Sequence, residues 1–253
     1  MNGVPSARLG ALVPPLALGV LAVLLWQGAV TVLGIEPFVL PAPFDIAGAF
    51  AENAGNVAAA ASVTGRNSLV GLAGGAVIGV VAAVLAAALG SVERLGSPLV
   101  AALSVVPVVA LAPVLYTMYG ADAQAARQIV AGVAAFVPVY VNSLKGFRRV
   151  QPVHRDLMRA CAATTWQATR AVTVPGALPH ISTGLKQASS LAVISALVAE
   201  YFGGPVGGLG KSITSAAASS NYTLAWAYVL GAVTVGLVFY LATVLLERLS
   251  TRH

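Results

Sequence analysis

Hydrophobic positions fall into six long segments that short polar stretches separate. The segments cover residues 12–33, 68–89, 99–119, 128–144, 181–201 and 223–246. A helix needs about 20 mainly apolar residues to cross the hydrocarbon core of a bilayer. The segments do not alternate in polarity as the strands of a membrane barrel do, and they are rich in Ala, Leu, Val and Gly. The pattern predicts one all-α integral membrane domain over residues 1–253, with six transmembrane helices.

The connections between these segments differ in length and composition. The longest is residues 36–66, whose first part contains three prolines and predicts extended or turn structure. An amphipathic helix is expected to follow over residues 46–61 and to lie at the membrane interface. Residues 91–97 predict a tight turn, and residues 202–222 predict a loop rich in Gly and Ser.

Composition supports a membrane protein and argues against a soluble one. The mean hydropathy is +0.88, and only 9% of the residues are charged, against about 25% in soluble domains. The net charge of +6 does not require nucleic acid, because membrane topology explains it. Of the 14 Lys and Arg residues, only Arg66, Arg127 and Lys211 fall outside if the N-terminus is inside. The excess of basic residues on one side predicts a multi-pass protein of the plasma or inner membrane with both termini cytoplasmic.

Several patterns that could indicate chemistry or a cofactor are weak. The single Cys161 excludes an intramolecular disulfide, and the three histidines do not cluster, so no metal site is expected. Residues 205–212 nearly match a phosphate-binding loop, but the first glycine is replaced by Pro205 and the segment follows a membrane helix rather than a strand. The sequence therefore predicts no catalytic residue, no bound nucleotide and no metal.

Residues 145–180 form a polar island between two apolar segments. The island holds six of the 14 basic residues: Lys145, Arg148, Arg149, Arg155, Arg159 and Arg170. Residues 154–174 can form one or two helices, and Pro175 and Pro179 are expected to break them. Such a helix, with apolar and basic faces, fits a groove in a soluble partner, but it also fits an interfacial helix on anionic lipid. The periodicity does not decide between them.

Prolines in the third segment and a glutamate at the end of the fifth each allow two interpretations. Pro107 and Pro113 would kink the third span, and the freed carbonyls are tolerated where they line a wet cavity or are buried in protein. The kink therefore predicts either a flexible, pathway-lining helix that includes Tyr116, or plain packing. Glu200 ends the fifth segment. It is either a gate or receptor contact, or an interfacial group that is solvated or forms a salt bridge with Lys211.

Several motifs in order resemble those of permease subunits of ATP-binding-cassette importers. Trp166 and the ending at residues 174–179 align the island with the conserved cytoplasmic loop of these permeases. Residues 156–158 then fall on its Glu-Ala-Ala triplet and Ala162 on its glycine. The motifs LPAP, VPVVALAP, GLK, VAEYFG and GGLG, between about residues 40 and 215, are similar to the nitrate, sulfonate, taurine and pyrimidine-precursor subfamily.

The resemblance implies a type I importer permease fold with a coupling helix between the fourth and fifth spans. It implies that the loop 145–180 contacts an ATPase subunit through Arg155, Asp156, Leu157, Met158, Arg159, Ala162, Ala163 and Trp166. It also favours a translocation pathway that includes Pro107, Pro113, Tyr116 and Glu200. The small residues of the triplet are replaced by Leu157 and Met158 and the glycine by Ala162, which would suit one half of an unequal permease pair.

The same resemblance implies the partners. Separate ABC ATPase subunits would bind ATP, a second permease copy or paralogue would complete the pathway, and an extracytoplasmic binding protein would deliver a small anion or heterocycle. Two other classes remain open: a stand-alone channel or ion-coupled secondary transporter, and a membrane scaffold. Ion coupling predicts charges in the centre of the bundle, whereas Arg127 and Glu200 lie at the ends of spans.

Overall fold

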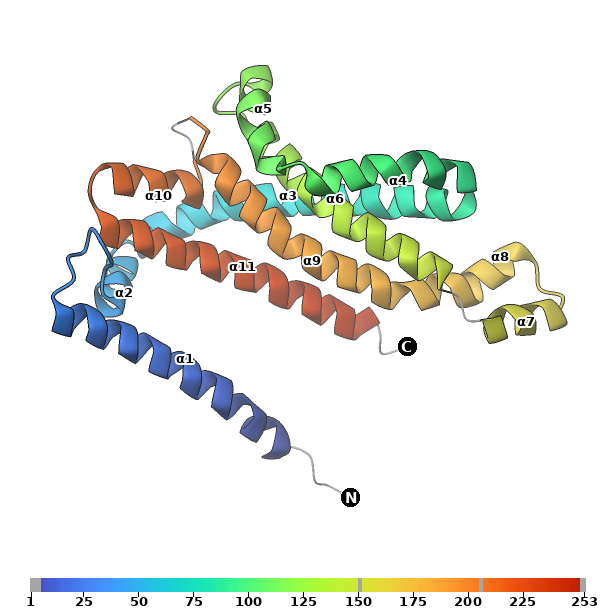
Figure 1. The fold of residues 1–253 in the computed structure, drawn as a ribbon, viewed down its shortest axis with the longest axis horizontal. Coiled ribbons are helices and arrows are strands. Elements are labelled where there is room, and N and C mark those ends of the chain that lie inside the picture. The colour runs from blue at the N-terminus through green and yellow to red at the C-terminus, as the bar shows by residue number, and fades with distance from the viewer. Residues whose placement is uncertain (1–5, 150–151, 205–206, 251–253) are drawn as a thin grey trace.

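The computed structural model describes residues 6–149, 152–204 and 207–250, and the only regular elements in this part of the chain are helices (Figure 1). The elements, in order, are α1 (Ser6–Leu33), α2 (Pro43–Glu52), α3 (Ala54–Ala88), α4 (Gly90–Val105), the 3-10 turn η1 (Val108–Leu111), α5 (Ala112–Tyr119), α6 (Gln124–Arg148), α7 (Pro152–Ala160), α8 (Thr165–Ala168), the π turn η2 (Thr169–Thr173), α9 (Val174–Glu200), α10 (Leu209–Ala218) and α11 (Tyr222–Ser250). The all-α class is confirmed for the described residues.

The predicted number of spans is also confirmed. Five helical stretches are long and apolar enough to cross a membrane, and α4 with η1–α5 forms a sixth that is bent by 87°. The described end of α11 points toward the side of the bundle where α7 and α8 lie (Figure 1).

Small residues bring the central helices together. α3, α6 and α9 form the centre of the bundle, and α11 lies along α9. A Cβ added to Gly75 of α3 would lie 3.0 Å from the Cβ of Ala135 and even nearer the carbonyl oxygen of Gly132, both on α6. The core beside this crossing is mostly alanine, with Ala131 and Ala135 fully buried. Close backbone approach at small residues is the usual packing device inside a bilayer, where hydrophobic burial does not drive helices together.

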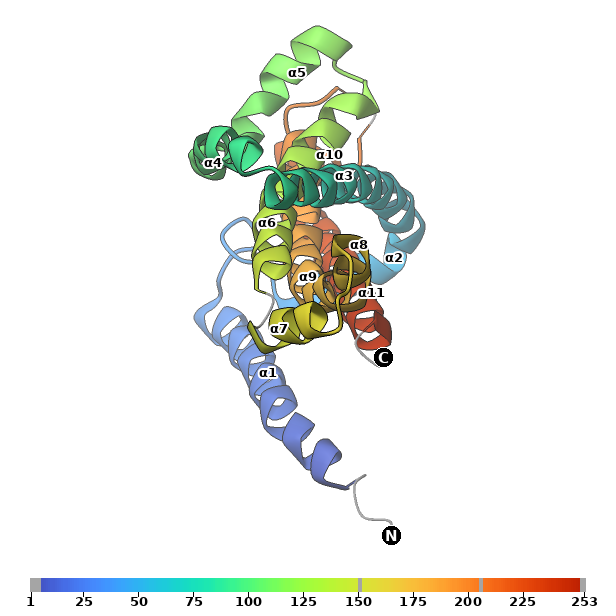
Figure 2. The same ribbon diagram turned by 90° about the vertical axis from the view of Figure 1, so that its right-hand side faces the viewer.

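α1 lies apart from the central bundle (Figures 1 and 2). Most of its large apolar side chains are exposed in the single chain. Contacts of its C-terminal part include a hydrogen bond from the N–H of Phe44 to Oε1 of Gln27 at 3.1 Å and an edge-to-face contact between the rings of Trp26 and Trp226 at 5.5 Å. The apolar surface of α1 is therefore left to lipid or to another subunit.

The third span is broken rather than kinked. Val106 is extended, with ψ at 127°, and Pro107 caps η1, which agrees with the extended conformation that a following proline imposes. Pro113 lies in the first turn of α5, where its missing N–H costs little. The prediction of one helix kinked at both prolines is wrong, because only Pro107 interrupts it.

Three predicted connections are also wrong. The interfacial helix ends at Glu52, and the rest of the predicted helix, from Ala54, belongs to the long helix α3. Residues 91–97 are helical, since the chain reverses at Leu89 and α4 begins at Gly90. Residues 209–218, predicted as loop, form α10.

The prolines at the end of the island, Pro175 and Pro179, do not break the helix. Pro175 lies in the first turn of α9 and Pro179 inside it, within one helical run from Thr165 to Glu200. Pro175 cannot donate to the carbonyl of residue 171, and that residue lies in the π turn η2. The wider turn accommodates the missing donor, so the helical run continues through the proline.

The tight crossing of α3 and α6 gives a stability prediction. Gly75→Val should lower the free energy of unfolding by about 1–3 kcal/mol, because the added side chain overpacks against the α6 backbone. Gly65→Val on the same helix is the control, since a Cβ there meets nothing within 4 Å. Thermal unfolding of both purified variants in detergent measures the difference, and equal melting temperatures would show that the crossing tolerates a larger residue.

Candidate functional site

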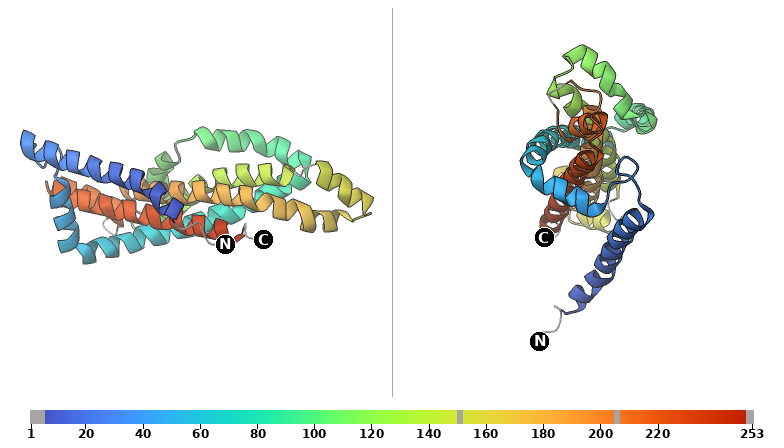
Figure 3. Two further views of the ribbon diagram at one scale, coloured as in Figure 1. Left: turned by 90° about the horizontal axis from the view of Figure 1, so that it is seen from below. Right: turned by 90° about the vertical axis from the view of Figure 1, so that its left-hand side faces the viewer.

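The island forms a helical hairpin beyond the end of the bundle. α7 runs away from α6, a short turn reverses the chain, and α8 leads back into α9 (Figure 3). The turn, residues 161–164, is the point of the chain farthest along the long axis at this end (Figures 1 and 3). The hairpin is thus presented to whatever lies beyond the bundle.

The turn of the hairpin depends on one residue in a left-handed conformation. Ala162 has φ of +49°, a region that costs a residue with a Cβ about 1–2 kcal/mol relative to the right-handed one. The N–H of Cys161 donates to the carbonyl of Leu157 at 3.0 Å, and that of Ala163 to Met158 at 2.9 Å. Ala162 is the position that aligns with the glycine of the permease loop. Its positive φ favours glycine, although this chain has alanine there.

A capping box fixes the start of α8. Oγ1 of Thr164 accepts a hydrogen bond from the N–H of Gln167 at 3.3 Å, and Oε1 of Gln167 accepts one from the N–H of Thr164 at 2.8 Å. These reciprocal bonds satisfy donors that a helix start leaves free. The returning arm of the hairpin is therefore held in one orientation although it is only one turn long.

Large apolar side chains are exposed along this hairpin. Val153 is 72% exposed, Leu157 53% and Trp166 71%. Asp156 and Arg159 form an exposed ion pair at 3.7 Å, which contributes little to stability. A hollow of about 410 Å³ lies between the arms and reaches Phe147 of α6. These exposed apolar side chains make the hairpin a candidate interaction surface.

The structure brings together the residues predicted to couple to an ATPase. Asp156, Leu157, Met158 and Arg159 lie on α7, and the other three lie in or just after the turn: Ala162, Ala163 and Trp166. Arg155 is on α7, but its side chain is outside the described part of the structure. Their proximity is shown, whereas their role as contacts stays a prediction.

A second cluster of polar side chains is buried at the opposite end of the central helices. Glu200, the last residue of α9, is fully buried. Its Oε2 accepts hydrogen bonds from Oγ1–H of Thr64 and from the N–H of Gly210, each at 2.9 Å. The N–H of Leu209 in turn donates to Oγ1 of Thr64 at 2.8 Å. The carboxylate thus accepts from a free N–H group at the N-terminus of α10 and lies at the positive end of that helix's dipole.

Arg127 of α6, also fully buried, extends this cluster to α5. Its Nε–H donates to the hydroxyl oxygen of Tyr116 at 3.0 Å, and its Nη1–H donates to Oε1 of Gln124 at 3.1 Å. The Tyr116 hydroxyl donates to the carbonyl of Ala199 at 3.1 Å. Nδ2–H of Asn67 donates to the same Gln124 oxygen at 2.7 Å. Hydrogen bonds therefore join α3, α5, α6, α9 and α10 at one place.

The predicted pathway residues divide into two groups. Tyr116 and Glu200 belong to the buried cluster, while Pro107 and Pro113 lie at the break and the start of α5. The expectation that Glu200 is solvated or paired with Lys211 is wrong, since its partners are Thr64 and Gly210. No group of three or more His, Cys, Asp or Glu side chains in the described residues is placed to hold a metal.

Sequence reasoning missed Arg127 as a functional residue. The sequence pattern indicates an outer charge at the end of a span, although Arg127 stands three residues after the start of α6. A charged residue at such a position needs a buried partner or solvent. That signal was available, but the partner Tyr116 lies on a separate helix and only the fold reveals it.

Comparison with known proteins identifies the family. Residues 75–252, more than two thirds of the chain, match the model of the binding-protein-dependent transport system inner membrane component. The chain belongs to this family.

Relatives of this transport component include the riboflavin transport system permease protein RibX of Chloroflexus aurantiacus, 30% identical over 94% of this chain and 90% of the relative. The formylaminopyrimidine transport permease protein ThiX of Halalkalibacterium halodurans is 30% identical over 71% of each chain. The taurine transport system permease protein TauC of Escherichia coli is 28% identical over 79% of this chain and 76% of the relative. The resemblance found in the motifs is thus confirmed.

A solved structure shows the same fold. The crystal structure of an amino acid ABC transporter with histidines aligns with a TM-score of 0.64 over 78% of this chain and 95% of that chain, at 14% identity. This chain therefore has two candidate sites: the hairpin of α7 and α8, and the buried cluster around Glu200.

The turn of the hairpin gives one prediction. Ala162→Gly should stabilise the hairpin by up to about 1 kcal/mol, because glycine adopts positive φ without a Cβ clash. Hydrogen–deuterium exchange should show slower exchange of the amides of residues 161–164. Ala160→Gly at the end of α7 is the control and should speed local exchange, since glycine weakens a helix. Faster exchange in Ala162→Gly would contradict the conformation of the turn.

The buried cluster around Glu200 gives a second prediction. Glu200→Ala should lower the free energy of unfolding by about 1–3 kcal/mol, because it leaves the N–H of Gly210 and the hydroxyl of Thr64 without their acceptor. Exchange should rise first at the N-terminus of α10. Glu36→Ala, at an exposed carboxylate, should change neither quantity. Unchanged exchange at α10 in Glu200→Ala would show that the carboxylate does not hold that helix.

Proposed function

We propose that this chain is the membrane-spanning permease subunit of an importer that is driven by ATP hydrolysis in separate ABC ATPase subunits. It forms half of the translocation pathway and receives the mechanical input through the loop 145–180. The observation that carries this proposal is the hairpin of α7 and α8, which presents exposed Leu157 and Trp166 beyond the end of the bundle. The family assignment supports it.

The shape of the hairpin favours a protein partner over lipid. An interfacial helix buries its apolar face along the membrane plane. Here two arms meet at a turn that points away from the bundle, so both arms cannot lie flat on the same lipid surface (Figure 3). A groove in a soluble subunit can enclose both arms and cover Leu157 and Trp166 together.

Movement of the hairpin has a rigid route into the membrane. The helical run from Thr165 to Glu200 is continuous, which corresponds to about 50 Å of helix. Glu200, at its far end, belongs to the cluster that holds α10 and, through Ala199 and Tyr116, α5. Displacement of α8 by an ATPase would therefore move α10 and the part of the third span beyond Pro107. This movement would reorient the pathway for alternating access.

The charge distribution supports an orientation and a set of partners. The hairpin end carries most of the basic residues, while Arg66, Arg127 and Lys211 lie toward the other end. Because basic residues stay on the cytoplasmic side, we place the hairpin and both termini in the cytoplasm. The binding protein then docks at the α10 end, and a second permease copy or paralogue completes the pathway.

The solute is proposed from the relatives. Those at 30% identity are named for riboflavin and formylaminopyrimidine, and a third for taurine. We therefore assign a small heterocyclic or anionic solute. An ion-coupled transporter is not favoured, because Arg127 and Glu200 lie near the ends of α6 and α9 and both are engaged in the cluster.

Loss of the apolar contacts of the hairpin tests this function. In the complex reconstituted in liposomes with its ATPase and binding protein, Trp166→Ala and Leu157→Asp should each weaken ATPase binding about tenfold or more and lower ATP-dependent uptake. Phe38→Ala, which removes an apolar side chain that is 65% exposed in another loop, is the control. Full coupled uptake after replacement of residues 153–166 by a Gly-Ser linker would refute the proposal.

A further inference from the structure

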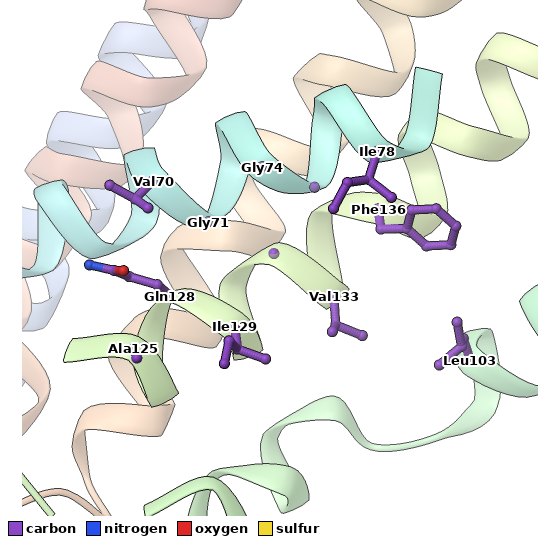
Figure 4. A pocket seen from close by; sticks show the side chains of 12 residues that line it. Val70, Gly71, Gly74, Ile78, Leu103, Ala125, Gln128, Ile129, Val133 and Phe136 are labelled. Carbon is purple, nitrogen blue, oxygen red and sulfur yellow. The ribbon is translucent and has the colours of Figure 1, made fainter. Parts of the chain in front are cut away.

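Two hollows lie along the side of α6 that faces α4. The first has a volume of about 530 Å³ and is lined by α3, α6 and Leu103 of α4. Figure 4 shows Ile129 and Val133 of α6 pointing into the space in front of Leu103. The second has a volume of about 410 Å³ and lies between α4 and the C-terminal half of α6. Both are within the size range of ligand sites.

The hollows lie end to end. Phe136 lines the first and Tyr140, one helical turn later, lines the second. Their rings are stacked with centroids 5.7 Å apart, so this pair lies on α6 where the two hollows adjoin. On α4, Leu103 lines the first hollow and the adjacent Ser104 the second. The two hollows are therefore neighbours along α4 and α6, and we call them together the α4–α6 groove.

The halves differ in polarity. Among the described residues that line the first half, only Gln128 at its far end has a polar side chain. The second half ends at Lys145 and Arg148 and also carries the hydroxyl of Ser104. Arg148 pairs with Glu93 of α4, and the planar guanidinium has further donors. Lys145 is exposed, and no ion pair of its ammonium is found among the described residues.

The length of the groove matches one lipid leaflet. From Lys145 to Ile129 the helix advances by 16 residues, or about 24 Å at 1.5 Å per residue. Half of a bilayer with its headgroup region is about 20–22 Å. A headgroup held at Lys145 would therefore place its acyl chain along Val133 and Ile129.

We propose that the α4–α6 groove binds an anionic phospholipid. Its phosphate lies at Lys145 and Arg148, its glycerol region beside Ser104 and Tyr140, and an acyl chain in the apolar half. A second copy of the chain is the other possible occupant, but an apolar helix in the groove would leave Lys145 without a counter-charge, whereas an anionic headgroup supplies one. Its headgroup end lies at the start of the loop 145–180, but none of the residues that line the groove is among those proposed to contact the ATPase.

Native mass spectrometry of the full chain tests the site with phosphatidylglycerol as the probe and phosphatidylcholine as the neutral comparison. Lys145→Gln should lower the preference for phosphatidylglycerol about fivefold. Arg94→Gln, at an exposed residue of α4 that does not line the groove, should leave it unchanged. Equal preferences in the two variants would overturn the proposal.

A steric variant tests the apolar half independently. A Cβ at Gly74 meets nothing within 4 Å, and Gly74 lines the groove, so Gly74→Leu should fill it and reduce binding of both lipids. Gly65→Leu, also in open space on α3, is the control. In a Cys161→Ser background, a disulfide between two copies at Val133→Cys that phosphatidylglycerol does not prevent would show that a second chain occupies the groove instead.

Discussion

The close contact of α3 with α6 determines how the rest of the chain is arranged. Gly71 and Gly75 allow the two backbones to meet at Gly132. About two helical turns before this crossing on each helix, Nδ2–H of Asn67 donates a hydrogen bond to Gln124. This bond belongs to the buried polar cluster. On the outer side of the crossing, Gly74 leaves open the space that becomes the apolar half of the α4–α6 groove. A bilayer offers no hydrophobic driving force for such a contact, so the small side chains themselves make it possible.

The two candidate sites lie at opposite ends of one helical run. The hairpin of α7 and α8 is exposed and held by a capping box and a strained turn, whereas the cluster at Glu200 is buried and held by several hydrogen bonds. The first is suited to contact a partner and the second to keep five helices in a fixed relation. The continuous helical run from Thr165 to Glu200 joins the exposed hairpin to the buried junction, as the proposed coupling requires.

The membrane class, the number of spans and the location of the hairpin could be predicted, because each is a local property of composition or of proline and charge spacing. The departures arise from nonlocal or backbone effects. Pro107 breaks its span instead of kinking it, while Pro175 is tolerated because a π turn precedes it. α10 could not be recognised in a Gly- and Ser-rich segment, since its N-terminus is satisfied by Glu200 from another helix. The contact between Arg127 and Tyr116 likewise joins separate helices.

The π turn at Thr169–Thr173 has a consequence for how such proteins diverge. A π turn holds one residue more than the α-helical turn it replaces, and each residue turns a helix by about 100°. Loss or gain of a single codon here would swing Trp166 around the axis of α9 while the transmembrane packing stayed as it is. A change of one residue in length would thus let related chains present the same hairpin to partner subunits of different shape. The buried helices would not need to change.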